Sequence, residues 1–67
     1  MTSTDLKEAR VKLGLTQQKM ATMLNTPLKT YLKWEHGERR VPGIVEAVLL
    51  LIFKYKGAIT ALGAKYT

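Results

Sequence analysis

The apolar positions of residues 4–13 recur every three or four residues, and this helical spacing predicts a first helix. Its buried face is expected to consist of Leu6, Ala9 and Leu13. Thr4 or Asp5 is suited to cap its start, and Gly14 suits the left-handed position that follows its end. The chain is therefore expected to open with a short amphipathic helix.

Residues 16–24 and 27–36 predict two more short helices, separated by only a few residues. Thr16 is the expected N-cap of the first, whose apolar face consists of Met20, Ala21, Met23 and Leu24. Pro27 fits the first turn of the second helix, where its missing N–H leaves no hydrogen bond unmade. The inward stripe of this helix is formed by Tyr31 and Trp34, and Gly37 is expected to end it.

Residues 42–56 contain the most apolar stretch and predict a longer helix that opens at Pro42. Apolar residues occupy nearly its whole circumference, and a 67-residue monomer has too little surface to bury them all. The simplest cover is a second copy related by two-fold symmetry, although a different partner protein is the alternative. The expected dimer interface consists of Val45, Leu49, Leu50, Ile52 and Phe53. Residues 57–67 form a tail that either adds a short fifth helix or frays.

No segment alternates with the period of a strand, and no linker or internal repeat divides the chain. The expected fold class is therefore all-α, a small bundle of four to five helices that forms one domain over residues 1–67. Within it, residues 16–36 have the spacing of a helix-turn-helix, in which the second helix lies in the major groove of DNA. Spacing alone is weak evidence, because many small helical bundles contain it.

The charge balance narrows the class of partner. Eleven Lys and Arg residues stand against five acidic residues, giving a formal net charge of +6. This imbalance favours a polyanion, either nucleic acid or an anionic membrane surface. The longest apolar run, residues 44–53, is about half of the ~20 residues that a membrane span needs, and the polar N-terminal segment is unlike a signal peptide. A soluble cytoplasmic protein with no membrane partner is expected.

The composition argues against an enzyme. The chain has no cysteine and one histidine, so neither a disulfide nor a cysteine-based metal site can form. It also lacks a Ser/His/Asp set and a glycine-rich phosphate loop. We expect no catalytic residue, no metal and no cofactor.

The combination of GLTQQKMATML with KWEHG resembles the XRE family of helix-turn-helix regulators, which includes the Cro and phage-repressor proteins. The matching features are the helix opening Leu15-Thr16-Gln17, the following Ala21, and the ending Trp34-Glu35-His36-Gly37. The resemblance covers about residues 4–53 and implies a lambda-repressor-like fold. The short WExG variant looks most like regulators from phage, toxin–antitoxin and anti-CRISPR-associated operons.

The resemblance implies roles for particular residues. Trp34 is expected to anchor the third helix, called the recognition helix, and Glu35 to pair with Arg10 as a structural lock. The positions that read bases are Leu28, Lys29 and Lys33; lysine can donate to guanine, and leucine can meet a thymine methyl group. The expected phosphate contacts are Gln17, His36, Arg39 and Arg40.

Together these features predict a homodimeric regulator of transcription that binds an inverted-repeat operator in double-stranded DNA. A repressor of its own operon is the leading hypothesis. The alternative is a protein-interaction module, an antitoxin or inhibitor, that binds a partner protein through the fourth helix or the tail.

Overall fold

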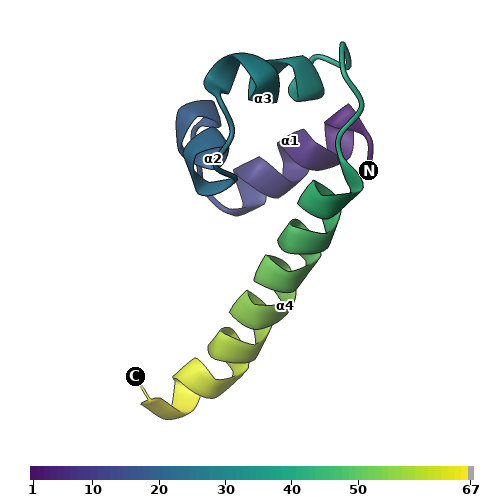
Figure 1. Ribbon diagram of the computed structural model, residues 1–67. Coiled ribbons are helices and arrows are strands. Elements are labelled where there is room, and N and C mark those ends of the chain that lie inside the picture. Colours follow the sequence, from purple (N-terminus) through teal and green to yellow (C-terminus); the bar gives the residue numbers. More distant parts are fainter. Residues whose placement is uncertain (67) are drawn as a thin grey trace.

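The computed structural model describes the backbone of residues 1–66 and the side chains of residues 1–55. Four helices follow one another along residues 1–66: α1 (Ser3–Lys12), α2 (Gln17–Met23), α3 (Leu28–Glu35) and α4 (Gly43–Tyr66). No strand occurs within residues 1–66, and the predicted all-α fold is confirmed. Helices α1, α2 and α3 form a compact unit, and α4 extends away from it (Figure 1). The molecule is elongated, measuring 43 × 19 × 18 Å.

Local signals set the ends of the short helices. Thr16 caps α2 by accepting a hydrogen bond from the Lys19 amide at 3.1 Å, as the sequence predicts. Three residues with positive φ, Gly14, Asn25 and Gly37, follow the ends of α1, α2 and α3. A left-handed residue at this position lets the chain turn away from the helix axis.

The start of α1 differs from the prediction. Thr2, rather than Thr4 or Asp5, is the N-cap, and its hydroxyl accepts a hydrogen bond from the Asp5 amide. The Asp5 carboxylate accepts a hydrogen bond from the Thr2 amide in return, which completes a capping box. This backbone bond, followed by the Thr2 hydroxyl, lowers the pKa of Asp5. The helix therefore begins earlier than the apolar pattern indicates, because the capping residues are polar.

The end of α4 corrects a second prediction. The sequence places the end of the fourth helix near residue 56 and a separate tail over residues 57–67, but α4 is one helix from Gly43 to Tyr66. It therefore continues through Gly57 and Gly63. A glycine inside a helix costs only about 1 kcal/mol relative to alanine, and each added residue contributes one more hydrogen bond. A lone glycine is a weak stop signal without a following proline.

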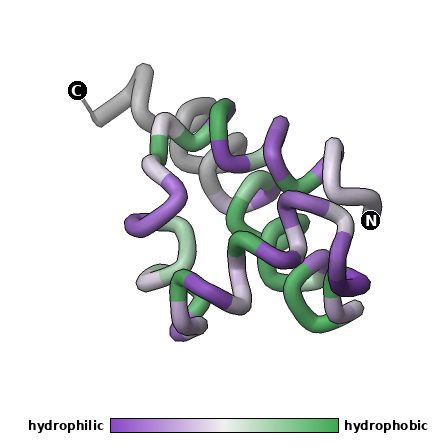
Figure 2. The backbone as a smooth tube through the Cα atoms, turned by 90° about the horizontal axis from the view of Figure 1, so that it is seen from above, coloured by the Kyte–Doolittle hydropathy of each residue, from purple (hydrophilic) through white to green (hydrophobic). Residues whose placement is uncertain are grey.

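The core lies between the three short helices and the first turns of α4. Every helix contributes to it, and in the view of Figure 2 hydrophobic and hydrophilic segments alternate along the backbone, as in amphipathic helices with one buried side. The buried apolar residues are Leu6, Ala9, Met20, Ala21, Tyr31, Trp34, Val41, Val45 and Leu49.

Candidate nucleic-acid interface

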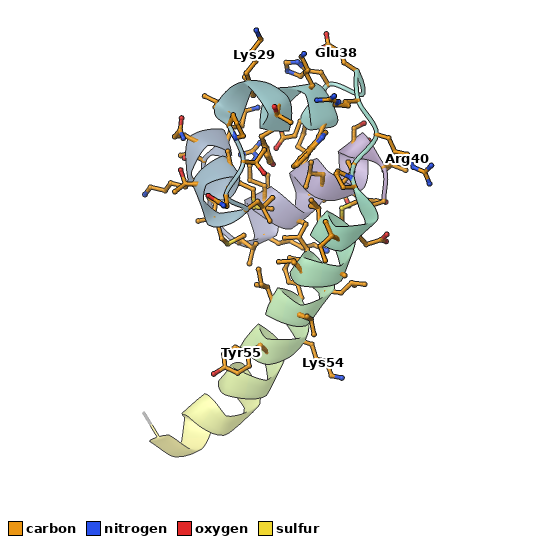
Figure 3. The ribbon with its side chains drawn as sticks, in the orientation of Figure 1. Lys29, Glu38, Arg40, Lys54 and Tyr55 are labelled. Atoms are coloured by element: carbon orange, nitrogen blue, oxygen red, sulfur yellow. The ribbon has the colours of Figure 1, made fainter. Side chains whose placement is uncertain are left out.

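Helix α3 has one buried side and one open side. Tyr31 is fully buried and Trp34 is 6% exposed, with their rings edge to face at a centroid distance of 6.2 Å. Such pairs add to the stability that burial provides. Lys29 is exposed and projects away from the body of the molecule (Figure 3), whereas Lys33 is half-buried. The helix therefore presents Lys29 outward while its two aromatic residues hold it against α1 and α2.

Leu28, which the family resemblance places among the base-reading positions, is only partly open to solvent. Its side chain is half-buried and packs against the core cluster. Leu28, Tyr31 and Glu35 lie three and four residues apart, so they share one side of the helix. The sequence analysis missed this row, and only part of the Leu28 side chain remains open. Its contact with a base stays a prediction, as do those of Lys29 and Lys33.

Glu35 is the centre of a buried polar cluster. Its side chain is fully buried, and the predicted pair is present: Arg10 Nε lies 2.8 Å from Glu35 Oε2. Gln17 Nε2 donates to Glu35 Oε1 at 3.2 Å, and the Tyr31 hydroxyl donates to Glu35 Oε2. Arg10 also donates to the Leu15 carbonyl oxygen at 3.1 Å. Side chains from α1, α2 and α3 thus converge on one carboxylate.

Electrostatics favours the charged form of this carboxylate. Burial alone raises the pKa of Glu35, but hydrogen bonds from Tyr31, Arg10 and Gln17 outweigh burial, so the pKa lies below its ordinary value. Burial, together with the bond to Glu35, raises the pKa of the Tyr31 hydroxyl, which remains a donor. Among residues 1–55, every buried side-chain nitrogen or oxygen has a hydrogen-bond partner. The cluster is therefore fully satisfied, the condition under which buried polar groups give rigidity.

Sequence analysis predicted Arg10 and Glu35 as partners but missed Tyr31 as a hydrogen-bonding member. Its spacing was the available signal, because residues four apart on a helix lie on the same side. Gln17, predicted to contact a phosphate, is half-buried and uses one amide hydrogen for Glu35. Its amide has a second hydrogen that can donate to a phosphate, and this contact stays a prediction.

The turn after α3 carries the remaining predicted phosphate contacts. Gly37 has φ +76°, and the amides of Glu38 and Arg39 donate to the Lys33 carbonyl oxygen at 2.9 and 3.2 Å. These bonds complete the end of α3 and fix the backbone of the turn. His36, Arg39 and Arg40 are all exposed. Two cationic side chains are thereby presented next to the recognition helix.

Glu38 belongs to the same surface, although the sequence analysis assigned it no part there. It is exposed and, like Lys29, projects from the α3 end of the molecule, while Arg40 points to the side (Figure 3). A carboxylate at this place accepts hydrogen bonds and repels phosphate. The surface is therefore not uniformly cationic.

The predicted dimer interface is wrong for two of its five residues. Val45 and Leu49 are 6% and 1% exposed and belong to the chain's own core. Ile52 and Phe53 are partly buried and pack against that core, while Leu50 is exposed. The reason is geometric: Val45 and Leu49 lie on the side of α4 that faces the other helices, so the chain's own core covers them.

Among the described residues, no helix is long and apolar enough to cross a membrane. Within the same residues, no group of three or more histidine, cysteine, aspartate or glutamate side chains could hold a metal ion.

Comparison with known proteins agrees with this geometry. Residues 6–52, most of the chain, match the sequence profile of the helix-turn-helix family, and the match spans α1, α2, α3 and the part of α4 that packs on them. No significant match was found among curated proteins or among solved structures. With two short helices joined by a tight turn, a cationic open side on the second and a profile match over the whole unit, the chain belongs to the helix-turn-helix family of XRE type, a family of DNA-binding regulators.

Proposed function

We propose that this protein is a sequence-specific regulator that binds an inverted-repeat operator in double-stranded DNA as a homodimer and represses its own operon. The observation that carries the proposal is the contrast between the two sides of α3. Lys29 is exposed on one side, whereas Tyr31, Trp34 and Glu35 are buried on the other. A recognition helix needs both: a bare side that reads bases and a clamped side that fixes its orientation.

Lys29 and Lys33 are the proposed readers of base edges. A lysine ammonium group donates to guanine O6 and N7 in the major groove. Lys29 is exposed whereas Lys33 is half-buried, so the contribution of Lys29 to specificity is proposed to be the larger. Leu28, half-buried, contributes through its exposed part by apolar contact with a thymine methyl group.

Arg39 and Arg40, with His36 and Gln17 in support, are the proposed phosphate contacts. Contacts of this kind position the protein on the duplex and depend on salt, but they carry no sequence information. The net charge of +6 favours association with the DNA polyanion. Repression would follow from occlusion, because a dimer seated on a promoter blocks the approach of polymerase.

The test measures binding to DNA from upstream of the protein's own gene against random DNA, at near-physiological salt and over a salt series. Lys29→Ala is expected to reduce the discrimination between these DNAs by roughly 1–3 kcal/mol. Arg40→Ala is expected to weaken both by the same factor and to reduce the salt slope by about one. Lys7→Ala, at an exposed lysine of α1, is the control and should change neither. If no fragment competes better than random DNA, specific repression is wrong.

A further inference from the structure

An apolar stripe on α4 faces solvent, and the function proposed above leaves it unused. Ile44, Leu51 and Tyr55 are 69%, 65% and 70% exposed, and Val48, between them, is half-buried. We call these four residues the outer stripe. They lie on a different side of α4 from the residues that pack into the core, Val45, Leu49 and Ile52. Large apolar side chains gathered in this way on a small protein mark a contact surface.

The spacing of the outer stripe is that of a coiled-coil seam. Its residues follow one another at intervals of four, three and four, the repeat that places side chains into the holes of a facing helix. In the sequence, Ala58 and Leu62 continue the same spacing beyond the side chains that the structure describes. A helix with such a seam is suited to pack along another helix with the same repeat.

We propose that the outer stripe pairs with the outer stripe of a second copy of this chain, with the two α4 helices parallel. The exposed parts of Ile44, Leu51 and Tyr55 amount to roughly 400 Å² per protomer, about half of the ~800 Å² that a standard interface buries on each side. This area fits a dimer that dissociates at low concentration and assembles fully on an operator with two half-sites. The three exposed side chains, with Val48 between them, form one continuous strip along α4 and are not scattered surface residues.

The parallel orientation rests on the proposed function. Lys29 lies at the α3 end of the molecule, and α4 runs from beside that unit towards the opposite end (Figures 1 and 3). A two-fold axis along the two α4 helices keeps both Lys29 side chains at the same end, where one duplex can meet them. An antiparallel pair would place them at opposite ends, and one duplex could not reach both.

The first experiment measures molar mass by light scattering over a range of protein concentrations. Leu51→Glu places a charge in the outer stripe and is expected to raise the dimer dissociation constant by roughly a hundredfold. Leu50→Glu is the matched control. It makes the same change at the preceding residue, which is 63% exposed but lies off the outer stripe, and it should leave the mass curve unchanged. Circular dichroism of both variants establishes that each one folds.

The second experiment determines the orientation. The chain has no cysteine, so single substitutions give unambiguous disulfides. A disulfide needs Cα atoms within about 7 Å of each other. In a parallel pair, Ile44→Cys and Tyr55→Cys should each cross-link to the same position of the second copy, and Leu50→Cys should not. In an antiparallel pair, at most one of the first two positions lies at the centre and can meet itself.

Three results would overturn the proposal: a wild-type protein that stays monomeric at the highest concentration, a dimer broken by Leu50→Glu rather than Leu51→Glu, or an antiparallel cross-linking pattern. Binding to a half-site duplex separates this failure from failure of the proposed function. The Leu51→Glu protein should still discriminate that half-site from random DNA in a manner that depends on Lys29. Loss of this discrimination with a normal mass curve would count against the DNA-binding role and leave the pairing intact.

Discussion

The α1–α3 unit buries a tyrosine together with a charged pair, whereas helix α4 exposes its tyrosine to solvent. In the unit, Tyr31 is fully buried and donates to Glu35, whose charge is matched by Arg10. On α4, Tyr55 is 70% exposed. The unit is complete in one copy of the chain, because its buried polar groups satisfy one another. Beyond the residues that reach the core, α4 leaves the apolar outer stripe facing water.

This difference indicates that the two regions have different roles. A recognition helix must keep one orientation, and a fully satisfied buried cluster holds it more specifically than apolar packing alone. In the proposed dimer, the outer stripe must instead stay open in the free protein. Paired variants at chemically similar positions of the two regions therefore test the comparison.

The largest effect is expected from the two tyrosines. Tyr31→Ala removes a fully buried ring and leaves Glu35 without one donor, and it should lower the free energy of unfolding by about 3–5 kcal/mol. A domain this small has only about that much stability, so the variant should be largely unfolded at 25 °C. Tyr55→Ala should change the stability of the monomer by less than about 0.5 kcal/mol. Urea unfolding followed by circular dichroism measures both; equal losses would erase the distinction between the regions.

Two glutamates give the next largest difference. Glu35→Gln keeps the shape of the side chain but leaves the Arg10 charge unmatched in a partly buried place, at a cost of about 3 kcal/mol. Glu38→Gln alters an exposed residue of the same type only three positions away, and its effect on unfolding should lie within about 0.5 kcal/mol. A small effect of Glu35→Gln would mean that apolar packing alone holds α3.

The same carboxylate predicts how stability depends on acid. The pKa of Glu35 in the folded protein lies below its ordinary value of 4.5, so below about pH 4.5 the unfolded chain binds more protons than the folded one. The contribution of Glu35 is therefore complete above pH 4.5 and is lost as the pH falls through the folded pKa, by up to about 1.4 kcal/mol per pH unit. Urea midpoints at several acidic pH values should show a steeper fall for the wild type than for Glu35→Gln. Asp5, whose pKa is also lowered, contributes equally to both proteins, and parallel curves would contradict the prediction.

The smallest changes in stability are expected at two glycines. Gly37 has φ +76°, and a Cβ there would lie 3.8 Å from Ser3 Oγ, so Gly37→Ala should destabilise by about 1 kcal/mol through backbone strain alone. Gly43 opens α4 with open space around an added Cβ, and Gly43→Ala should stabilise by about 0.5–1 kcal/mol. Thermal unfolding midpoints measure both, with shifts of opposite sign expected.

The sequence predicts the short helices well because their boundaries are local: Thr16 and the positive-φ residues Gly14 and Gly37 act within a few positions. It predicts the end of α4 poorly, because a single glycine does not decide whether a helix continues. The contact of Arg10 with Glu35, 25 residues apart, came from family resemblance. No local rule supplies such a contact, since it depends on how α1 and α3 pack.

The sequence predicts that the apolar surface of α4 is too large for one chain to bury, but it does not predict which residues face a partner. Apolar residues around the whole of α4 predict that one side is covered by a partner, but the side taken by the core depends on where α1 lies. Val45 and Leu49 were assigned to the wrong side for this reason. The partial burial of Leu28 could have been predicted from the sequence, because Leu28 lies three residues before the buried Tyr31.

The attachment of α4 has a mechanical consequence. The segment between α3 and α4 is held to the rest of the protein at Val41, which is buried, while its neighbour Arg40 is exposed. Val45, Leu49 and Ile52 fix the first turns of α4 to the core, so only the part of α4 beyond residue 53 extends past the rest of the protein. That part is about 20 Å long, so a bend of ~10° at its base moves its far end by roughly 3 Å. In the proposed dimer, contacts at Ile44 therefore fix the angle between the two units, and with it the tolerance for half-sites at unequal separations, more firmly than contacts near Tyr55.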